Sequence, residues 1–159
     1  MSRQFFIDIS IGLSVFLLLF AGMPAMAGDA MVITSETLMA DQDTNIAVFE
    51  GSVVARSGNI VLSAERMTAN YGDGGALKNL VAEGLVKLVK GLQVLTSNKA
   101  VYDVALRRMD FTGEPRAVEE GNVLMGSRIS YFIDEDRIKV DRSTVIIEDQ
   151  KTGTGGAGE

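Results

Sequence analysis

Four segments of this 159-residue chain open alike, and this repetition limits the possible folds more than any other feature. The openings are Ser35-Glu36-Thr37-Leu38, Ala64-Glu65-Arg66-Met67, Ser97-Asn98-Lys99-Ala100 and Ser127-Arg128-Ile129-Ser130-Tyr131. Three continue to a shared pattern around a glycine, in Phe49-Glu50-Gly51-Ser52-Val53, Ala82-Glu83-Gly84-Leu85-Val86 and Phe111-Thr112-Gly113-Glu114-Pro115. These glycines are spaced by 33 and 29 residues. Such a period marks stacked supersecondary units, each too small to bury its own apolar face.

Apolar and polar residues alternate within each unit, which is typical of β-strands with one buried face. Met67, Ala69 and Tyr71 are apolar and enclose polar residues, so a strand would point all three to one face. The same phase recurs in Leu38 and Ala40, in Ala100, Tyr102 and Val104, and in Ile129, Tyr131 and Ile133. The glycine-containing segments keep it in Phe49, Gly51, Val53 and Ala55, in Ala82, Gly84, Val86 and Leu88, and in Phe111, Gly113, Pro115 and Ala117.

Turn signals separate these segments, and we expect Gly58, Gly91 and Gly121 to supply positive φ in hairpins. The pattern predicts about a dozen or more strands of roughly four to seven residues, shorter than the 9–11 of an outer-membrane barrel. The chain is therefore expected to be all-β, either a β-helix or a folded-over antiparallel sheet of jelly-roll type. In both, the apolar faces turn inward and line a long trough.

Residues 1–27 are expected to be a secretory signal peptide that is cleaved after Ala27. A positive start at Arg3 precedes an apolar run from Ile9 to Phe20, and the segment ends in a small-x-small pattern. An uncleaved anchor is the alternative, but the run is shorter than the roughly 20 residues that span a bilayer. Residues 28–150 would form one domain, and residues 151–159 a disordered Gly-rich tail.

Composition argues against most catalytic chemistry. The chain has no histidine and no cysteine, so the usual acid–base, zinc and thiol arrangements are missing. We expect no catalytic residue, no metal site and no cofactor. The net charge of −6 argues against a nucleic-acid partner. The best enzymatic alternative is a β-helix that cleaves polysaccharide, but the repeat pattern turns its carboxylates outward.

The repeated segments resemble the LptA/OstA-like family of periplasmic lipopolysaccharide-transport proteins. The resemblance runs from about Met31 to Glu148. It rests on Ile33-Thr34-Ser35-Glu36-Thr37-Leu38, Ala47-Val48-Phe49-Glu50-Gly51-Ser52-Val53-Val54, Leu62-Ser63-Ala64-Glu65-Arg66, Ala100-Val101-Tyr102-Asp103, Phe111-Thr112-Gly113-Glu114-Pro115-Arg116, and Gly126-Ser127-Arg128-Ile129-Ser130-Tyr131 with Asp134-Glu135-Asp136-Arg137. The family often has Gly-Asp-Arg where this chain has Ser97-Asn98-Lys99 and Gly126-Ser127-Arg128, a difference that concerns local turn hydrogen bonds.

The resemblance implies an open β-jelly-roll and a non-enzymatic role in the periplasm. It implies that the protein shields the acyl chains of lipopolysaccharide (its lipid A moiety) inside the sheet. It further implies a head-to-tail homo-oligomer that meets inner-membrane and outer-membrane components of the transport machinery. A passive surface or structural β-repeat protein remains the alternative from a different class.

Candidate site residues follow from the phase of the strands. The lipid-binding candidates are the inward-facing residues Met31, Ile33, Leu38, Phe49, Val53, Met67, Leu88, Tyr102, Phe111 and Tyr131. The alternative for each is that it only packs in a closed core. Arg66, Lys99 and Arg128 share one repeat position, either as a rim that contacts lipid phosphates or, as we favour, as a solvated outer column. Ile33, Val145 and Ile147 mark the strand-prone edges through which copies would assemble, with an edge covered by the tail as the alternative.

Overall fold

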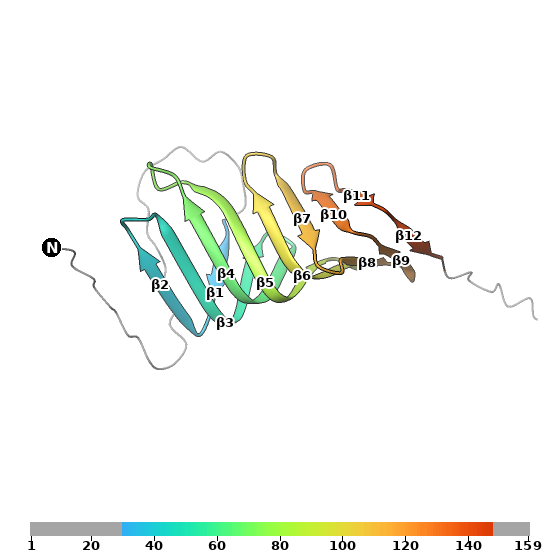
Figure 1. Ribbon diagram of the computed structural model, residues 1–159, viewed down its shortest axis with the longest axis horizontal. Coiled ribbons are helices and arrows are strands. Elements are labelled where there is room, and N and C mark those ends of the chain that lie inside the picture. The colour runs from blue at the N-terminus through green and yellow to red at the C-terminus, as the bar shows by residue number, and fades with distance from the viewer. Residues whose placement is uncertain (1–29, 148–159) are drawn as a thin grey trace, which may run out of the picture.

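The computed structural model describes residues 30–147, and all of its regular structure is β (Figure 1). Twelve strands form a single antiparallel sheet over this part of the chain. Within the same residues no helix is long and apolar enough to cross a membrane. The all-β prediction is therefore confirmed. The expected leader, 1–27, and the expected tail, 151–159, lie outside the described residues.

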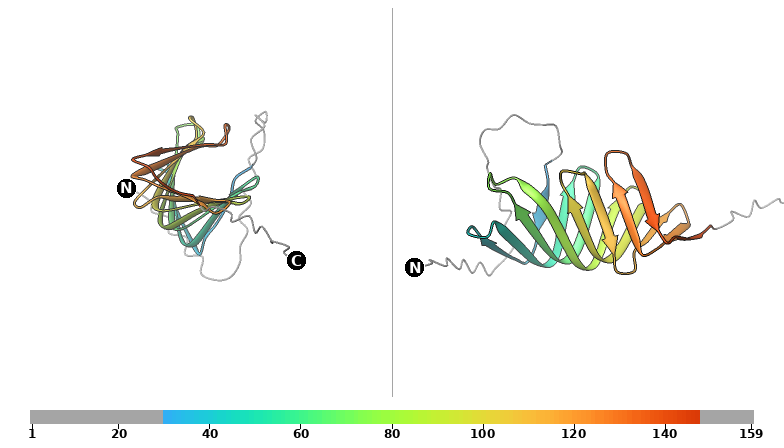
Figure 2. Two further views of the ribbon diagram at one scale, coloured as in Figure 1. Left: turned by 90° about the vertical axis from the view of Figure 1, so that its right-hand side faces the viewer. Right: turned by 45° about the horizontal axis from the view of Figure 1, so that its top comes forward.

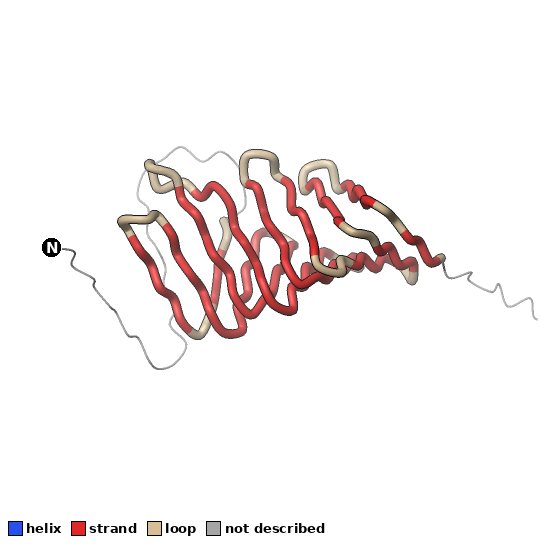
Figure 3. Tube along the Cα trace, in the orientation of Figure 1, coloured by secondary structure: helices blue, strands red, loops and turns tan. Residues whose placement is uncertain are grey.

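The strands differ widely in length, because four of them pass through a bend without breaking (Figure 3). They are β1 (Val32–Thr34), β2 (Thr37–Asp41), β3 (Ile46–Ser57), β4 (Ile60–Tyr71), β5 (Leu77–Lys90), β6 (Gln93–Asp103), β7 (Arg108–Thr112), β8 (Arg116–Glu119), β9 (Asn122–Met125), β10 (Arg128–Phe132), β11 (Arg137–Asp141) and β12 (Thr144–Ile146).

The sheet is folded over into two layers that meet along one corner (Figure 2). Layer A contains β2, the adjoining halves of β3 to β6, and β7, β10 and β11. Layer B contains β1, the other halves of β3 to β6, and β8, β9 and β12. The hairpin turns lie at the two free margins of these layers, opposite the corner. This is the open, folded-over jelly-roll that the sequence predicted, and it is not a β-helix.

The bend arises from β-bulges at the repeated glycines. The register of β3 against β4 shifts between Glu50 and Val53, and that of β5 against β6 shifts between Glu83 and Val86. Gly51 and Gly84 have φ of 81° and 77° there. A bulge bends a strand while its flanks stay hydrogen-bonded. The prediction of short strands throughout was therefore wrong for β3 to β6, which have 11 to 14 residues each.

Each repeated glycine also lies beneath a side chain from the preceding strand or corner. A methyl group on Gly51 would lie 2.5 Å from a carboxylate oxygen of Glu36, and one on Gly113 would lie 2.8 Å from Cβ of Asn98. Glu65 covers Gly84 in the same way. The second residue of each of the first three repeated openings therefore packs over a corner glycine, which explains why the two patterns recur together. Gly58, Gly91 and Gly121 have the positive φ expected of them in hairpins.

Candidate functional site

The inner face of the folded sheet carries three apolar rows that run across all the strands of each layer. Layer A contributes the row Leu38, Phe49, Met67, Ala82, Ala100, Phe111, Ile129 and Val140. It also contributes the row Ala40, Ala47, Ala69, Leu80, Tyr102, Met109, Tyr131 and Ile138. Layer B contributes Ile33, Ala55, Leu62, Leu88, Leu95, Ala117, Leu124 and Val145. The structure thus places eight of the ten lipid-binding candidates in these rows, whereas Met31 and Val53 lie outside them.

The middle of this surface is closed. Five of the lipid-binding candidates have no exposed surface, because the two layers pack on each other there: Val53, Met67, Leu88, Phe111 and Tyr131. Tyr102 is also buried. All six belong to the main core cluster. In this state they are core residues as well as candidates for lipid contact.

The N-terminal end of the inner face is open. Leu38 is 45% exposed and Met31 is 37% exposed, while Phe49 and Ile33 are partly buried against the core. Apolar side chains at this end of the sheet therefore meet solvent.

The opposite end of the sheet is also open. β11 and β12 lie at the far end of the molecule from β1 and β2 (Figure 1). Val145 and Ile147, two of the predicted assembly residues, are 52% and 71% exposed, and Ile146 between them is 50% exposed. Each terminal strand pairs on one side only within the described residues: β2 and β1 with β3, β11 with β10, and β12 with β9. Both ends thus combine apolar side chains with unpaired backbone edges.

The outer face of layer A carries a row of alternating charges beside the corner. Arg66 and Lys99 lie in this row, and each pairs with the glutamate of the strand before it. Arg66 Nη1 is 3.1 Å from Glu50 Oε1, and Lys99 Nζ is 2.9 Å from Glu83 Oε1. Arg128 lies further along the row, between Thr112 and Asp141. The three cations are thus placed outside the trough, on the face turned away from the apolar rows.

Sequence reasoning missed a polar cluster at the free margins of the layers. Lys90 ends β5 on the inner face, two residues after buried Leu88. Its Nζ lies 2.8 Å from Asp136 Oδ1, and it donates a 2.9 Å hydrogen bond to the hydroxyl of Tyr131. The Tyr131 hydroxyl donates in turn to Asp136 at 2.8 Å. The signal was available in part, because Lys90 breaks an apolar alternation, but its partner is 46 residues away.

This cluster shifts the ionisation of its members. The hydrogen bond from Lys90, followed by that from Tyr131, lowers the pKa of Asp136 below its ordinary value. The same contact with Asp136, aided by Tyr131, raises the pKa of Lys90. Burial raises the pKa of the Tyr131 hydroxyl. The ion pair is therefore fully charged around neutral pH.

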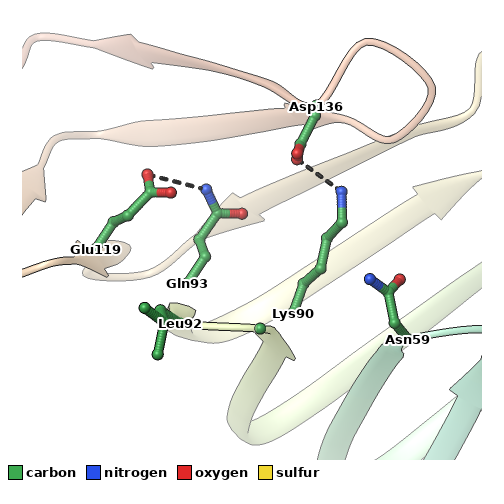
Figure 4. Close-up of a pocket in the computed structure, with 7 residues that line it drawn as sticks. Asn59, Lys90, Leu92, Gln93, Glu119 and Asp136 are labelled. Carbon is green, nitrogen blue, oxygen red and sulfur yellow. Dashed lines mark hydrogen bonds and ion pairs between the residues drawn. The ribbon is translucent and has the colours of Figure 1, made fainter.

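A small hollow lies beside the cluster, between the two margins (Figure 4). It has a volume of about 160 Å³. Its lining is Asn59, Lys90, Gly91, Leu92, Gln93, Glu119 and Asp136. Gln93 Nε2 donates a 3.4 Å hydrogen bond to Glu119 Oε2, whereas Gln93 Oε1 is buried and has no partner. The margin is polar, in contrast to the apolar rows beneath it.

The acidic side chains of the described residues are dispersed and do not gather at one site. Among residues 30–147 no group of three or more acidic side chains is arranged to hold a metal ion. The carboxylates of the predicted turns lie at the margins: Asp134 contacts Arg107, and Glu135 contacts Arg137. These are surface ion pairs. Within the described residues, the most extensive feature is the apolar inner face of the sheet.

Comparison with known proteins agrees with this geometry. Residues 32–137 match the family described as "LptA/(LptD N-terminal domain) LPS transport protein". No curated protein matches the chain. The fold is similar to a crystal structure of LptH from Pseudomonas aeruginosa, titled as the LptA-homologous periplasmic component of the lipopolysaccharide transport device. That similarity has a TM-score of 0.68 at 15% identity, over 76% of this chain and 96% of LptH. Because the family match covers most of the chain and the fold agrees with it, this protein belongs to the LptA/LptD N-terminal-domain family of lipopolysaccharide transport proteins.

Proposed function

We propose that the protein is a periplasmic carrier of lipopolysaccharide that shields the lipid A acyl chains between its two layers. The observation that supports this most directly is the set of three apolar rows, which run unbroken from one open end of the sheet to the other. An apolar surface of this kind would hold acyl chains without polar contacts along its length. Export and cleavage of residues 1–27 are part of the proposal, and mass spectrometry of the mature N-terminus tests them.

Burial of the acyl chain would drive binding. Each methylene removed from water contributes about 0.8 kcal/mol, so a chain of about fourteen carbons gains on the order of 10 kcal/mol before the costs of association. An exposed ion pair, such as those that Arg66 and Lys99 form, contributes at most about 1 kcal/mol of interaction free energy. The tails therefore dominate affinity, and the headgroup phosphates remain in water.

We further propose that copies join end to end and bridge the inner-membrane and outer-membrane components of the transport machinery. β11 runs antiparallel to β10, and the alternation of directions through layer A leaves β2 of a following copy antiparallel to β11. The same reasoning sets β1 of that copy against β12. Such pairing satisfies the free edges and extends the sheet as a filament.

One register continues the apolar rows of both layers at once. It places Leu38 of the following copy beside Val140 and Ile33 beside Val145. A slip by one residue would turn every apolar side chain of the added strands to solvent. The trough would then run without interruption from copy to copy, which a carrier that spans a wide gap requires.

Leu38 and Met39 give a matched test of the trough. They are neighbours on β2, are 45% and 65% exposed, and point to the inner and outer faces respectively. We expect Leu38→Asp to weaken binding of a fluorescent C14 acyl probe by about tenfold or more, because the charge would have to be desolvated beside the chain. Met39→Asp should bind as the wild type does. Equal affinities for the two variants would contradict an acyl site on the inner face.

The closed interior favours a second candidate, a passive structural β-protein. Met67, Phe111 and Tyr131 have no exposed surface, as in an ordinary core. Two observations would support the transport function over the structural one. The first is lipopolysaccharide that co-purifies with the protein, and the second is saturable displacement of the acyl probe by lipopolysaccharide. A wild-type protein that shows neither behaviour would decide for the structural role.

A further inference from the structure

The free margins of the two layers are joined by the cluster of Lys90, Tyr131 and Asp136, which we call the latch. Lys90 belongs to layer B, where β5 ends, and Asp136 belongs to the β10–β11 turn of layer A. Lys90 extends from its strand across the hollow toward Asp136 on the opposite hairpin (Figure 4). The ion pair is 2.8 Å long, and the Tyr131 hydroxyl contacts both partners. The latch thus ties layer A to layer B on the side opposite the corner.

The interior beneath the latch is fully closed. Four residues there have no exposed surface: Leu88, Leu95, Ile129 and Tyr131. The hollow beside the latch has about 160 Å³, well below the roughly 300–1,000 Å³ typical of pockets that hold small organic ligands. An acyl chain can reach these residues from the side only if the margins move apart.

We propose that the latch is a gate, and that acyl chains enter the trough sideways between the β5–β6 turn and the β10–β11 turn when it opens. This inference rests on the proposed function, because it concerns how the same trough is filled. Leu92, at the tip of the β5–β6 turn, is 77% exposed and lines the hollow. It places an apolar side chain at the lip of the gate, where an incoming chain would first leave water.

The latch is built to open at low cost. The Asp136 side chain is 62% exposed, so water and salt screen its attraction to Lys90. The closed state also leaves Gln93 Oε1 buried without a hydrogen-bond donor. A buried acceptor without a partner is unfavourable, and parting of the margins would let water reach it. The unpaired oxygen of Gln93 therefore makes the closed state less favourable.

The gate hypothesis predicts how the affinity for acyl chains depends on opening. If acyl chains bind only when the margins are parted, the apparent Kd is the intrinsic Kd divided by the fraction of open molecules. A substitution that weakens the latch should therefore tighten acyl binding and accelerate it. A substitution in a merely structural ion pair should do neither.

The chain provides a matched control for this test. Asp136→Ala removes the carboxylate of the latch, and Glu83→Ala removes the carboxylate of the 2.9 Å ion pair with Lys99 on the outer face. With a fluorescent C14 acyl probe in stopped-flow, we expect Asp136→Ala to lower Kd and raise the association rate several-fold. Glu83→Ala should match the wild type. The exchanged pair Lys90→Glu with Asp136→Lys should return both values toward those of the wild type.

A second measurement follows the gate without any lipid. The chain has no cysteine, so a thiol placed at buried Leu95 by Leu95→Cys is the only site for maleimide labelling. We expect labelling to be several-fold faster in the Asp136→Ala background than in the Glu83→Ala background. Equal labelling rates in the two backgrounds would overturn the gate. So would acyl binding by Asp136→Ala that is no tighter than that of the wild type. Failure of the wild type to bind any acyl probe would instead overturn the proposed carrier function, whatever the labelling rates.

Discussion

At the scale of single residues, the corner of the sheet depends on glycines that a side chain from a neighbouring strand covers. Gly113 has φ of 73°, and a methyl group added to it would lie 2.8 Å from Asn98 Cβ. Gly75 has nearly the same φ, 76°, but stands in an open turn with nothing within 4 Å. The two positions therefore share the backbone requirement and differ only in the contact.

That difference makes a prediction about stability. Gly75→Ala should cost about 1–2 kcal/mol, because an L-residue is strained at positive φ. Gly113→Ala should cost about 1–3 kcal/mol more, because Asn98 Cβ belongs to a strand and cannot swing aside. Urea unfolding of both variants measures the two costs. Similar losses for the two variants would show that the covered corner adds nothing beyond its backbone angles.

At the scale of elements, hairpins far apart in the sequence are tied together by polar contacts at the margins. The β5–β6 and β10–β11 hairpins meet through Lys90 and Asp136, and the β6–β7 and β10–β11 turns meet through Arg107 and Asp134, whose Nη2 and Oδ1 are 2.9 Å apart. The Arg107 contact lies within layer A, where a backbone hydrogen bond from Ile133 to Arg107 accompanies it. The corner joins layer A to layer B covalently, whereas their free margins meet through the side chains of Lys90, Tyr131 and Asp136. Opening at the margins is therefore the motion that the connectivity permits.

The latch should make stability depend on pH. Hydrogen bonds from Lys90 and then from Tyr131 lower the pKa of Asp136 below its ordinary value of 3.8. The stabilisation of the fold by ionised Asp136 is therefore complete above pH 3.8, and it is lost as the pH falls through the lowered pKa. The difference in urea midpoint between wild type and Asp136→Ala should be present at pH 7 and shrink in strong acid. At the alkaline end, the raised pKa of Lys90 keeps the pair charged until the pH exceeds its ordinary 10.5. An acid-independent difference would mean that Asp136 stabilises the fold by packing and not by charge.

At the scale of the whole molecule, the proposed end-to-end assembly predicts which residues of two copies meet. Continued rows place Met39 on β2 of one copy beside Lys139 on β11 of another, both on the outer face. Because the chain has no cysteine of its own, a Met39→Cys copy mixed with a Lys139→Cys copy should form a disulfide-linked dimer on oxidation. Non-reducing electrophoresis measures its yield.

An offset pair is the control for this register. Met39→Cys mixed with Arg137→Cys places the thiols two residues out of line, beyond easy disulfide geometry. We expect several-fold less dimer from that mixture. A higher yield from the offset pair would replace the proposed register, and no dimer from either mixture would argue against joining through β2 and β11.

The local features of this fold could be predicted from the amino-acid sequence. Alternation such as that of Met67, Ala69 and Tyr71 sets which face of a strand is apolar, because side chains in a strand point to opposite sides in turn. The recurring glycines likewise marked where units repeat. That β3 to β6 bend near those glycines without ending could not be predicted, because a bulge depends on the register of two paired strands. The contact between Lys90 and Asp136 and the complete burial of Phe111 in the middle of the trough could not be predicted either. Contacts between distant residues depend on how the two layers fold over each other, and that is not encoded in the period of any one strand.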